Sequence, residues 1–500
     1  MTAVGDRIRR RAIRAVGGAA RARVVLLLAS VLALSSADTS AVGADAGPLK
    51  RALHLDFTQL GLLVALPTLV AAVATVPIGS LSDRVSRVFL LKWSIVAWSL
   101  AMIAAGASTS FQMLLVSRLI LGAVTATSGP TLASLTGDYF EPRERGKIYG
   151  FILTGELVGS VTGLLVSGNA AAISWRLAFW VLVLPSAVLG WAVWRFLPEP
   201  ARGGASRLPA RGHPQPDTAD REREPGHNDQ RHDVAKPASE LERTIRAAGV
   251  HPRPENLLTA GSERMTLSEA VRYVLRVPTN LALIIASALG YFFISGVLTF
   301  GVIFVRHQYS VGQSVATSLL AVLAIAAVIG VLVTGRLADA LIRRGHVSGR
   351  VIVAAGTFLV ACALFLPPLL TRSLVIGLPF LWLAGAALYG SNPPLDAARL
   401  DIMPHWLWGR AEGVRTLLRS LATAFAPLLF GFISDQFGHG GPASHASGQA
   451  ANSRGITSAF LIMLVPLAAG GLILLRARRD YPRDVATAIA CEAGNRVSED

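Results

Sequence analysis

Charged side chains are scarce in this chain of 500 residues. Asp, Glu, Lys and Arg make up 16% of it, whereas a soluble globular protein carries about 25%. Hydrophobic residues make up 52%. Because so little polar material cannot cover a water-facing surface of this size, the composition excludes an ordinary soluble protein and predicts a membrane protein whose surroundings are the lipid bilayer.

Cysteines and metal-binding patterns are also nearly lacking. The two cysteines, Cys362 in an apolar stretch and Cys491 in a polar one, exclude a disulfide framework and a thiolate zinc site. The ten histidines show no metal spacing, and no glycine-rich phosphate loop occurs. We therefore expect no catalytic residues, no metal and no cofactor, and the chain is not predicted to be an enzyme. ATP-driven pumping is disfavoured for the same reason.

Twelve apolar runs are long enough to cross about 30 Å of hydrocarbon as helices. They cover residues 24–44, 58–78, 89–109, 112–137, 148–169, 177–197, 279–305, 314–335, 351–371, 375–400, 411–434 and 456–475. A long polar stretch separates the first six from the last six. The predicted fold class is an all-α polytopic membrane protein with twelve transmembrane helices in two six-helix bundles.

The basic residues predict how the chain sits in the membrane. With the N-terminus inside, 39 of the 47 Lys and Arg fall in inner segments and six in outer loops. Because basic residues near span ends resist translocation, both termini are predicted to be cytoplasmic. The net charge of +16 is thus an orientation signal, and we expect no nucleic-acid partner. The Ala- and Arg-rich composition suggests a bacterial plasma membrane, where we expect a monomer.

Residues 198–278 form the polar stretch between the bundles. They hold thirteen basic and twelve acidic residues and lack apolar periodicity up to about residue 240, so we expect a mostly disordered cytoplasmic linker. Helical spacing after the N-cap candidate Thr266 predicts an interfacial helix near 265–277. The remaining divisions are a basic cytoplasmic segment (1–23), the N-terminal bundle (24–197), the C-terminal bundle (279–475) and a cytoplasmic tail (476–500).

Two sequence signatures recur in both halves. The chain reads "GSLSDRVSRV" from Gly79 after the second run and "GRLADALIRR" from Gly335 after the eighth, with Gly, Leu, Asp and Arg at the same relative positions. It reads "DYFEPRERGKIYG" from Asp138 after the fourth run and "DIMPHWLWGRAEG" from Asp401 after the tenth. In each of these, a Gly-basic pair begins eight residues after the Asp. Recurrence at equivalent places predicts two pseudo-symmetric halves.

Twelve spans, a central linker and the loop motif G-x-x-x-D-R-x-x-R resemble the major facilitator superfamily. The usual motif has Gly where this chain has Ser86 and a basic residue where it has Val88. The resemblance implies a cytoplasmic gating motif, in which charge relays latch the halves together. Carried over by motif position, its residues are Gly79, Asp83, Arg84, Arg87 and Asp138 in the first half, and Gly335, Asp339, Arg343 and Asp401 in the second. The alternative is a set of solvated loop charges that only enforce topology.

Ionisable residues within the spans are the strongest chemical signal, because a charge at mid-bilayer costs about 2.5 to 3.5 kcal/mol on insertion scales. Asp38 in the first span and Arg118 in the fourth both lie roughly 9 Å from the outer end, counting about 1.5 Å per residue. Arg118 and Gly122 also resemble a superfamily motif associated with proton coupling. We predict a pair in which protonation of Asp38 releases Arg118. The alternative is a structural ion pair that never titrates.

Glu156 in the fifth span is a third proton-coupling candidate. It adjoins a face on which Gly155, Gly159 and Gly163 recur every four residues, which permits a close helix approach. A carboxyl group in a low dielectric suits a proton carrier or a binder of a cationic substrate. The alternative is a Glu held by hydroxyl or backbone groups.

The tenth span carries the substrate-cavity candidates Asn392 and Asp396. Pro393 and Pro394 lack amide donors and must break the helix there. The freed carbonyls and the two polar side chains could line a substrate site. Alternatively, Asp396 pairs with Arg399 one turn further on.

Within the superfamily, "GPTLASLTGDYFEPRERGKIYGFILTGELVGS" and "SNPPLDAARLDIMP" are similar to the spinster-like transporters, which export lysolipids and related amphiphiles. That group has an Arg after the Asp of the first span and a Glu in the fourth, where this chain has Thr39 and, nearby, Thr125. The resemblance implies a secondary active transporter that exports an amphipathic or hydrophobic organic compound by alternating access, coupled to protons. Two alternatives are an importer or facilitator of a polar metabolite, such as an organic anion or sugar, and a non-transporting membrane scaffold.

Overall fold

The computed structural model describes residues 18–140, 145–200, 240–258, 265–439 and 448–499. Most of the predicted basic segment 1–23 and residues 201–239 of the predicted linker lie outside this part of the chain. The first half, called the N half, contains α2 (Ala19–Ala52), α3 (Phe57–Arg84), α4 (Arg87–Ala107), α5 (Phe111–Thr125), α6 (Ser128–Tyr139), α7 (Arg145–Ile173), α8 (Trp175–Trp180) and α9 (Val183–Phe196).

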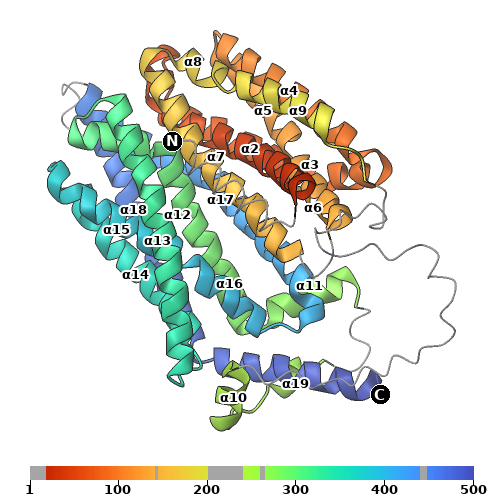
Figure 1. Cartoon of the computed structure of the whole chain (residues 1–500). Helices are drawn as coiled ribbons and strands as arrows, with labels where there is room; N and C mark the ends of the chain where they lie inside the picture. The colour runs from red at the N-terminus through yellow and green to blue at the C-terminus, as the bar shows by residue number, and fades with distance from the viewer. Residues whose placement is uncertain (1–17, 141–144, 201–239, 259–264, 440–447, 500) are drawn as a thin grey trace, which may run out of the picture.

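The second half, called the C half, contains α12 (Pro278–Tyr309), α13 (Gln313–Arg343), α14 (Gly349–Leu370), α15 (Leu374–Gly390), α16 (Asn392–Asp401), α17 (Trp408–His439) and α18 (Gly448–Ala477). Between the halves come α10 (Glu240–Ala247) and α11 (Leu267–Arg276), and α19 (Tyr481–Glu499) follows the C half. In Figure 1 the N half runs from red to yellow and the C half from green to blue, as two bodies of helices. The all-α fold class is confirmed.

The predicted spans correspond to helices, with two corrections. Eleven helices of the described part are long and apolar enough to cross a membrane. One correction is that the predicted span 177–197 is interrupted, because α8 ends at Trp180 and α9 begins at Val183. The other is that the predicted span 112–137 is not continuous, because α5 ends at Thr125 and α6 begins at Ser128. Pro130 lies in the first turn of α6, where its lack of an amide N–H breaks no helical hydrogen bond. The predicted break in the tenth span is present, since α15 and α16 meet at Ser391.

Small residues hold α2 and α7 together inside the N half. Gly155, Gly159 and Gly163 lie against Ala29, Ala33 and Ala37 of α2, and a Cβ added to any of these glycines would overlap the backbone of α2. Such a flat surface gains its stability from dispersion contacts at close range, because the lipid supplies no hydrophobic driving force between helices. The two helices therefore form one rigid unit.

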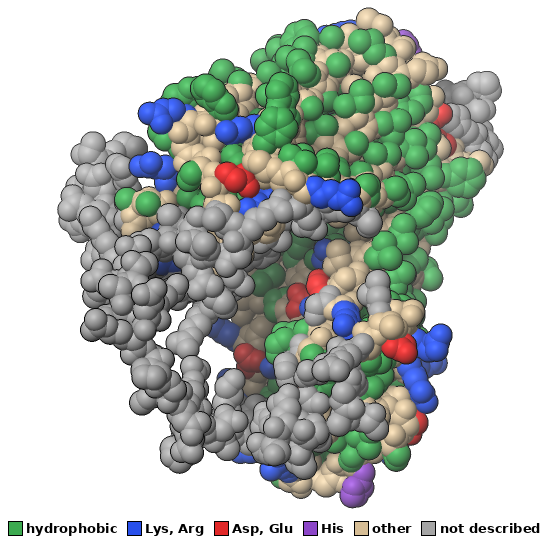
Figure 2. All heavy atoms as spheres, turned by 90° about the vertical axis from the view of Figure 1, so that its right-hand side faces the viewer, with side chains coloured by type: hydrophobic (Ala, Val, Ile, Leu, Met, Phe, Trp, Pro, Cys, Tyr) green, Lys and Arg blue, Asp and Glu red, His purple; other side chains and the backbone are tan. Residues whose placement is uncertain are grey.

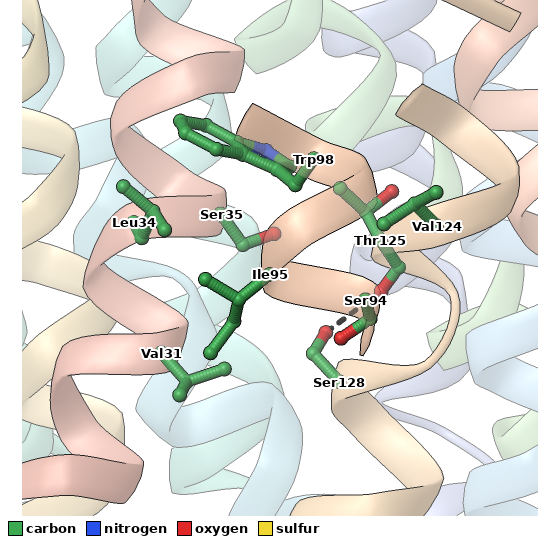
Figure 3. A pocket seen from close by; sticks show the side chains of 9 residues that line it. All are labelled: Val31, Leu34, Ser35, Ser94, Ile95, Trp98, Val124, Thr125 and Ser128. Atoms are coloured by element: carbon green, nitrogen blue, oxygen red, sulfur yellow. Dashed lines mark hydrogen bonds between the residues drawn. The ribbon is translucent and has the colours of Figure 1, made fainter. Parts of the chain in front are cut away.

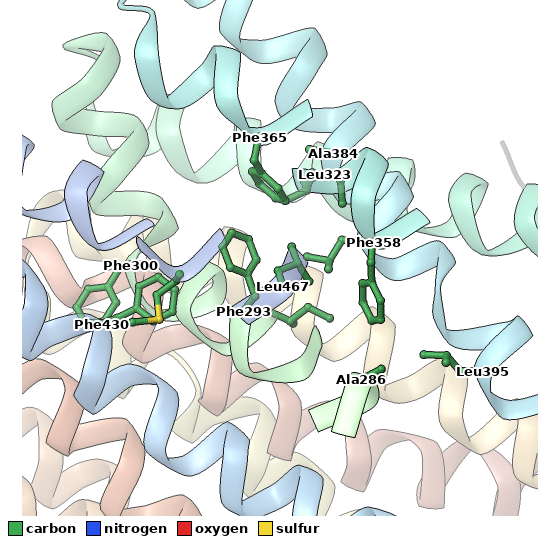
Figure 4. Packing of buried hydrophobic residues seen from close by; sticks show 14 of the residues in the cluster. Ala286, Phe293, Phe300, Leu323, Phe358, Phe365, Ala384, Leu395, Phe430 and Leu467 are labelled. Atoms are coloured by element: carbon green, nitrogen blue, oxygen red, sulfur yellow. The ribbon is translucent and has the colours of Figure 1, made fainter. Parts of the chain in front are cut away.

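Aromatic packing fills the core of the C half. Phe293 of α12 lies 4.9 Å from Phe365 of α14, ring centroid to centroid, and Phe430 of α17 lies 5.2 Å from Phe460 of α18, both edge to face. Figure 4 shows Phe293, Phe300, Phe365 and Phe430 among the buried residues of this cluster. Edge-to-face pairs of this kind add about 0.5 to 1.5 kcal/mol each beyond the area that they bury.

The two halves contact each other at one end. We call the end where α3 leads into α4 and α13 into α14 the basic end; it is the predicted cytoplasmic side. The contacts between halves lie at the opposite end, where Gly61 of α3 touches Pro427 of α17 and Gly168 of α7 touches Thr317 of α13. Asp435 of α17 also accepts hydrogen bonds from the first amides of α3. This arrangement is closed at the opposite end.

A platform of short segments covers the basic end of the C half. It consists of residues 240–258, α11 and α19, and Figure 1 shows α19 with α10 across the lower end of the C half. The helix α11 occupies Leu267–Arg276, capped by Thr266 and Glu269, within the stretch for which a helix is predicted. The predicted tail 476–500 contains a helix, α19, whose Tyr481 and Cys491 are buried.

Hydrogen bonds and an ion pair hold this platform together and attach it to the C half. Asp484 of α19 accepts from the Thr279 amide at the start of α12 at 3.1 Å, and it pairs with Arg253 of the linker at 3.1 Å. The Thr487 hydroxyl oxygen accepts from the Arg253 amide at 2.9 Å, and the Cys491 sulfur accepts from the Leu258 amide at 3.3 Å. Burial raises the pKa of Asp484, and the bonds from Thr279 and the charge of Arg253 offset part of this effect.

Candidate functional site

The structure brings Asp38 and Arg118 together. Arg118 Nη1 of α5 lies 2.6 Å from Asp38 Oδ1 of α2. The two residues are only 5% and 3% exposed, and Arg118 Nε has no hydrogen-bond partner in the described part of the chain. A buried pair of this kind is sensitive to protonation, because neutralising one partner leaves the other as an uncompensated buried charge.

A pocket lies in the N half, about one helical turn along α2 from Asp38. It is lined by Val31, Leu34, Ser35, Ser94, Ile95, Trp98, Val124, Thr125 and Ser128 (Figure 3). Four hydroxyl groups and an indole N–H thus face apolar side chains, and the Trp98 Nε1 donor has no acceptor among the described residues. The break between α5 and α6 opens this pocket, since Thr125 and Ser128 stand on either side of it. Such a lining suits an amphipathic molecule.

A second buried acid, Asp45, was not anticipated from the sequence. It lies seven residues beyond Asp38 on α2, two helical turns along the same face. It is 0% exposed, and neither carboxyl oxygen has a hydrogen-bond partner in the described residues. A charge without partners is costly in such a place, so Asp45 is a proton-binding candidate. The sequence did contain a sign of this site, because Asp45 is an acidic residue at the end of an apolar run.

Glu156 stands apart from the Asp38–Arg118 pair. It is exposed on α7, next to the Gly155 that touches α2. No hydrogen bond or ion pair reaches its carboxyl group from the described residues, so neither hydroxyl nor backbone groups hold it in this conformation. Leu164 and Ser167 continue the same face toward the opposite end. There Leu164 packs against the core and Ser167 is buried.

At the basic end of the N half, Arg87 and Asp138 form an ion pair. Glu199 completes a clasp that the sequence analysis missed. Its carboxylate accepts from Arg87 Nε at 3.0 Å, from the Ser86 hydroxyl at 2.7 Å and from the Val88 amide at 2.7 Å. Burial would raise the pKa of Glu199, but these hydrogen bonds lower it below its ordinary value. All of these residues belong to the N half.

The surroundings of two predicted members of this motif are only partly described. Gly79 and Asp83 lie in α3, but their side-chain environment falls outside the described residues. Arg84 is the last residue of α3 and is exposed. The N-half motif thus rests on Arg87 and Asp138.

In the C half, the structure corrects the predicted partner of Asp401. Arg343 is exposed at the end of α13 and does not approach Asp401. Instead, Arg350 at the start of α14 pairs with Asp401, and it lies 4.0 Å from Asp339. The Tyr481 hydroxyl of α19 also donates to Asp401, much as Glu199 joins the pair of the N half. Gly335 lies in α13 close to Pro393.

The pairs in the two halves are equivalent because each joins residues 51 positions apart. Arg343 was predicted as the partner because it follows Gly335 at the same distance at which Arg87 follows Gly79. In the C half α13 continues past its Asp to residue 343 and a turn follows before α14. Counting backward from Asp138 and Asp401 would have found Arg87 and Arg350.

The substrate-cavity candidates lie at the break of the tenth span. Asn392 is half-buried at the start of α16, and its side chain has no hydrogen-bond partner among the described residues. Asp396 does not pair with Arg399; its Oδ1 lies 2.8 Å from Arg415 Nη1 of α17. Arg399 instead pairs with Glu412. Glu412 and Arg415 lie in the first two turns of α17, which bring their side chains against α16.

A model of the Major Facilitator Superfamily matches residues 26–396 of the chain. The chain belongs to the Major Facilitator Superfamily. It is therefore a multi-pass membrane protein with the fold of that superfamily. The solved structure of a bacterial homologue of the human lysosomal transporter Spinster, inward-facing and unoccupied, superposes with a TM-score of 0.73 at 21% identity. The alignment covers 93% of this chain and 98% of that one, which shows a shared superfamily fold.

Curated superfamily relatives match over shorter stretches. A 3-(3-hydroxy-phenyl)propionate transporter of Escherichia coli is 28% identical over 171 residues, 34% of this chain and 42% of that protein. A hexuronate transporter of Bacillus subtilis is 27% identical over 190 residues, 37% of this chain and 44% of that protein. This chain thus spans less than half the length of these relatives.

Proposed function

We propose that this chain is a secondary active transporter that exports an amphipathic or hydrophobic organic compound by alternating access, in exchange for protons. The observation that carries the proposal is the buried Asp38–Arg118 pair, set inside a bundle whose halves contact each other at one end. The pocket about one helical turn from Asp38 offers hydroxyl groups and apolar side chains to such a compound. The transporter would work as a monomer in a bacterial plasma membrane, with both termini cytoplasmic.

In the proposed cycle, proton binding changes the stability of one state relative to the other. Protonation of Asp38 removes the attraction that compensates the charge of Arg118. The conformation that buries Arg118 is then disfavoured. The chain would change to a conformation in which substrate or solvent reaches the Arg118 guanidinium. Glu156 is open to solvent or lipid in the present conformation and would carry a further proton as the halves close over it. The clasps around Arg87 and Arg350 would brace the basic ends of the helices that move.

Flux measurements in proteoliposomes test this proposal. A pH gradient is imposed on the purified protein, and proton movement is recorded as amphiphiles, drugs and metabolites are added. We expect substrate-dependent proton flux that Asp38→Asn and Arg118→Gln each abolish, while Arg344→Gln, an exposed arginine at the end of α13, leaves it unchanged. Absence of flux across a broad panel would refute the transporter. Uphill flux that survives both Asp38→Asn and Glu156→Gln would refute the assignment of the coupling residues.

A second candidate function is transport of an organic anion, in the direction of import or export. It is favoured by arginines that lie inside the C half, at Arg399, Arg415 and Arg419. The names of the relatives are consistent with it, since those proteins transport a phenylpropionate and a hexuronate. The same flux assay, run with carboxylates and their neutral amides, separates this candidate from the first.

A further inference from the structure

Arginines and acids gather where α16 and α17 meet in the C half. Arg415 lies 2.8 Å from Asp396 and 2.8 Å from Glu412, and Arg399 also pairs with Glu412. Arg399 and Arg415 are only 9% and 8% exposed. These groups lie in α16 and the first two turns of α17, near the basic end.

Arg419 is the member of this cluster without an acidic partner. Its guanidinium carbon lies 4.6 Å from the ring centroid of Tyr291 on α12. No carboxylate in the described part of the chain pairs with it. Two acids, Asp396 and Glu412, thus face three guanidinium groups, which leaves one positive charge uncompensated. A cation–π contact compensates only part of that charge.

Arg419 lies on α17 between a contact with α3 and the basic end. Gly61 of α3 touches Pro427 of α17, and Arg419 follows two helical turns closer to the basic end. There Arg419 and Tyr291 are half-buried rather than enclosed. Figure 2 shows Lys, Arg, Asp and Glu side chains between the large hydrophobic surface above and the smaller one below. An anion that reaches this part of α17 from the basic end would meet an uncompensated guanidinium.

We propose that Arg419 binds the oxyanion group of an amphipathic organic substrate, a carboxylate or a phosphate, with Arg399 and Arg415 adding positive charge and Tyr291 orienting the guanidinium. This inference rests on the proposed transport function and names its substrate class. A guanidinium matches an oxyanion through two parallel N–H donors. The organic part of the substrate would lie against neighbouring apolar side chains.

Binding of three matched probes tests the site. The probes are 3-phenylpropionate, 2-phenylethyl phosphate and the neutral 3-phenylpropanamide, titrated calorimetrically into the full-length protein in nanodiscs at neutral pH. We expect at least one of the two anions to bind ten times more tightly than the amide, because a hydrogen-bonded charge pair of this kind commonly contributes a factor of ten or more. The preferred anion tells whether the group is a carboxylate or a phosphate.

Variants locate the binding energy. Arg419→Gln should reduce the affinity for the anions to that for the amide. Arg419→Lys should retain part of the anion affinity, because an ammonium keeps the positive charge but lacks the two parallel N–H donors of a guanidinium. Tyr291→Phe should bind as the parent protein does, whereas Tyr291→Leu should bind anions more weakly. Arg344→Gln is the matched control and should leave affinity unchanged. If Arg419→Gln does not fold, as judged by gel filtration, the comparison of Tyr291→Leu with Tyr291→Phe decides.

The outcomes separate this site from the transport function. Equal affinity for the amide and both anions, or anion binding that survives Arg419→Gln, overturns the oxyanion site. If anion binding does not depend on Arg419 but proton-coupled flux of an uncharged amphiphile persists in the Arg419→Gln protein, the proposed transport function holds and the oxyanion site is refuted. If the anions bind through Arg419 but no flux accompanies them in proteoliposomes, the site stands and the transport function fails.

Discussion

Asp435 offers a direct measure of what holds the two halves together at the opposite end. It lies near the end of α17, and its carboxylate accepts from the Phe57 amide at 3.0 Å, the Thr58 amide at 2.8 Å and the Thr58 hydroxyl at 2.7 Å. These donors begin α3, so the carboxylate also faces the positive end of the helix dipole. The contact exists only while the opposite end is closed.

Replacing this aspartate removes all three hydrogen bonds at once. Because Asp435 is half-buried, we assign each bond a net contribution of about 1 kcal/mol, or about 3 kcal/mol together. That corresponds to a shift of roughly a hundredfold in the ratio of the two conformations. A population of about 99 to 1 in favour of the present conformation would become about 1 to 1 in Asp435→Ala.

Pulsed electron resonance distances in nanodiscs can detect this shift. Spin labels at positions 84 and 343, both exposed at the basic end, report whether that end is open, after Cys362 and Cys491 are replaced. We expect Asp435→Ala to add a population with a shorter label distance, and Gln436→Ala, its exposed neighbour, to leave the distribution unchanged. An unaltered distribution in folded Asp435→Ala would refute the reasoning that this carboxylate stabilises one state.

Other predictions concern stability. Gly159→Ala should lower the unfolding temperature, at a cost of about 1 to 3 kcal/mol, because its Cβ would overlap the α2 backbone, whereas Gly150→Ala meets open space and should not. Arg350→Gln should destabilise the protein more than Arg343→Gln in the same thermal assay, since only the former leaves a buried acid unpaired; equal effects would contradict the reassigned pair. Glu199 has a lowered pKa, so its stabilising contribution is present above the ordinary Glu pKa of about 4.3 and is lost as the pH falls through the lowered value. Glu199→Gln should therefore flatten the acid limb of the stability curve, and an unchanged limb would show that the clasp contributes little.

Features governed by local chemistry were predictable from the sequence. The apolar runs located the spans because a helix in lipid must satisfy its own backbone. The helix break at Pro393 and Pro394 followed from their missing amide donors. Asp38 and Arg118 were matched by depth, since a constant rise per residue places both at one level, and by the resemblance of Arg118 and Gly122 to a superfamily motif.

Features that depend on long-range packing were not predictable. The carboxylate of Glu199 meets residues more than 100 positions away, and no periodicity marks such a contact. Arg415 and Arg419 fall inside the predicted span 411–434, but hydropathy alone does not show which side chains they contact. The break before Ser128 left a signal in Pro130, but a proline three residues into a helix is compatible with either a continuous or a divided span.

The platform on the basic end has a practical consequence for experiments. In the described part of the chain, Asp484 and Tyr481 of the platform bond to the C half, so we expect the platform to move with that half. When two halves of a protein rotate relative to each other, residues far from the pivot move further than residues near it. A fluorophore carried near the end of α19 would magnify a small rocking of the halves into a large displacement against a second dye on the N half, which turns the C-terminus into a pointer for the state of the transporter.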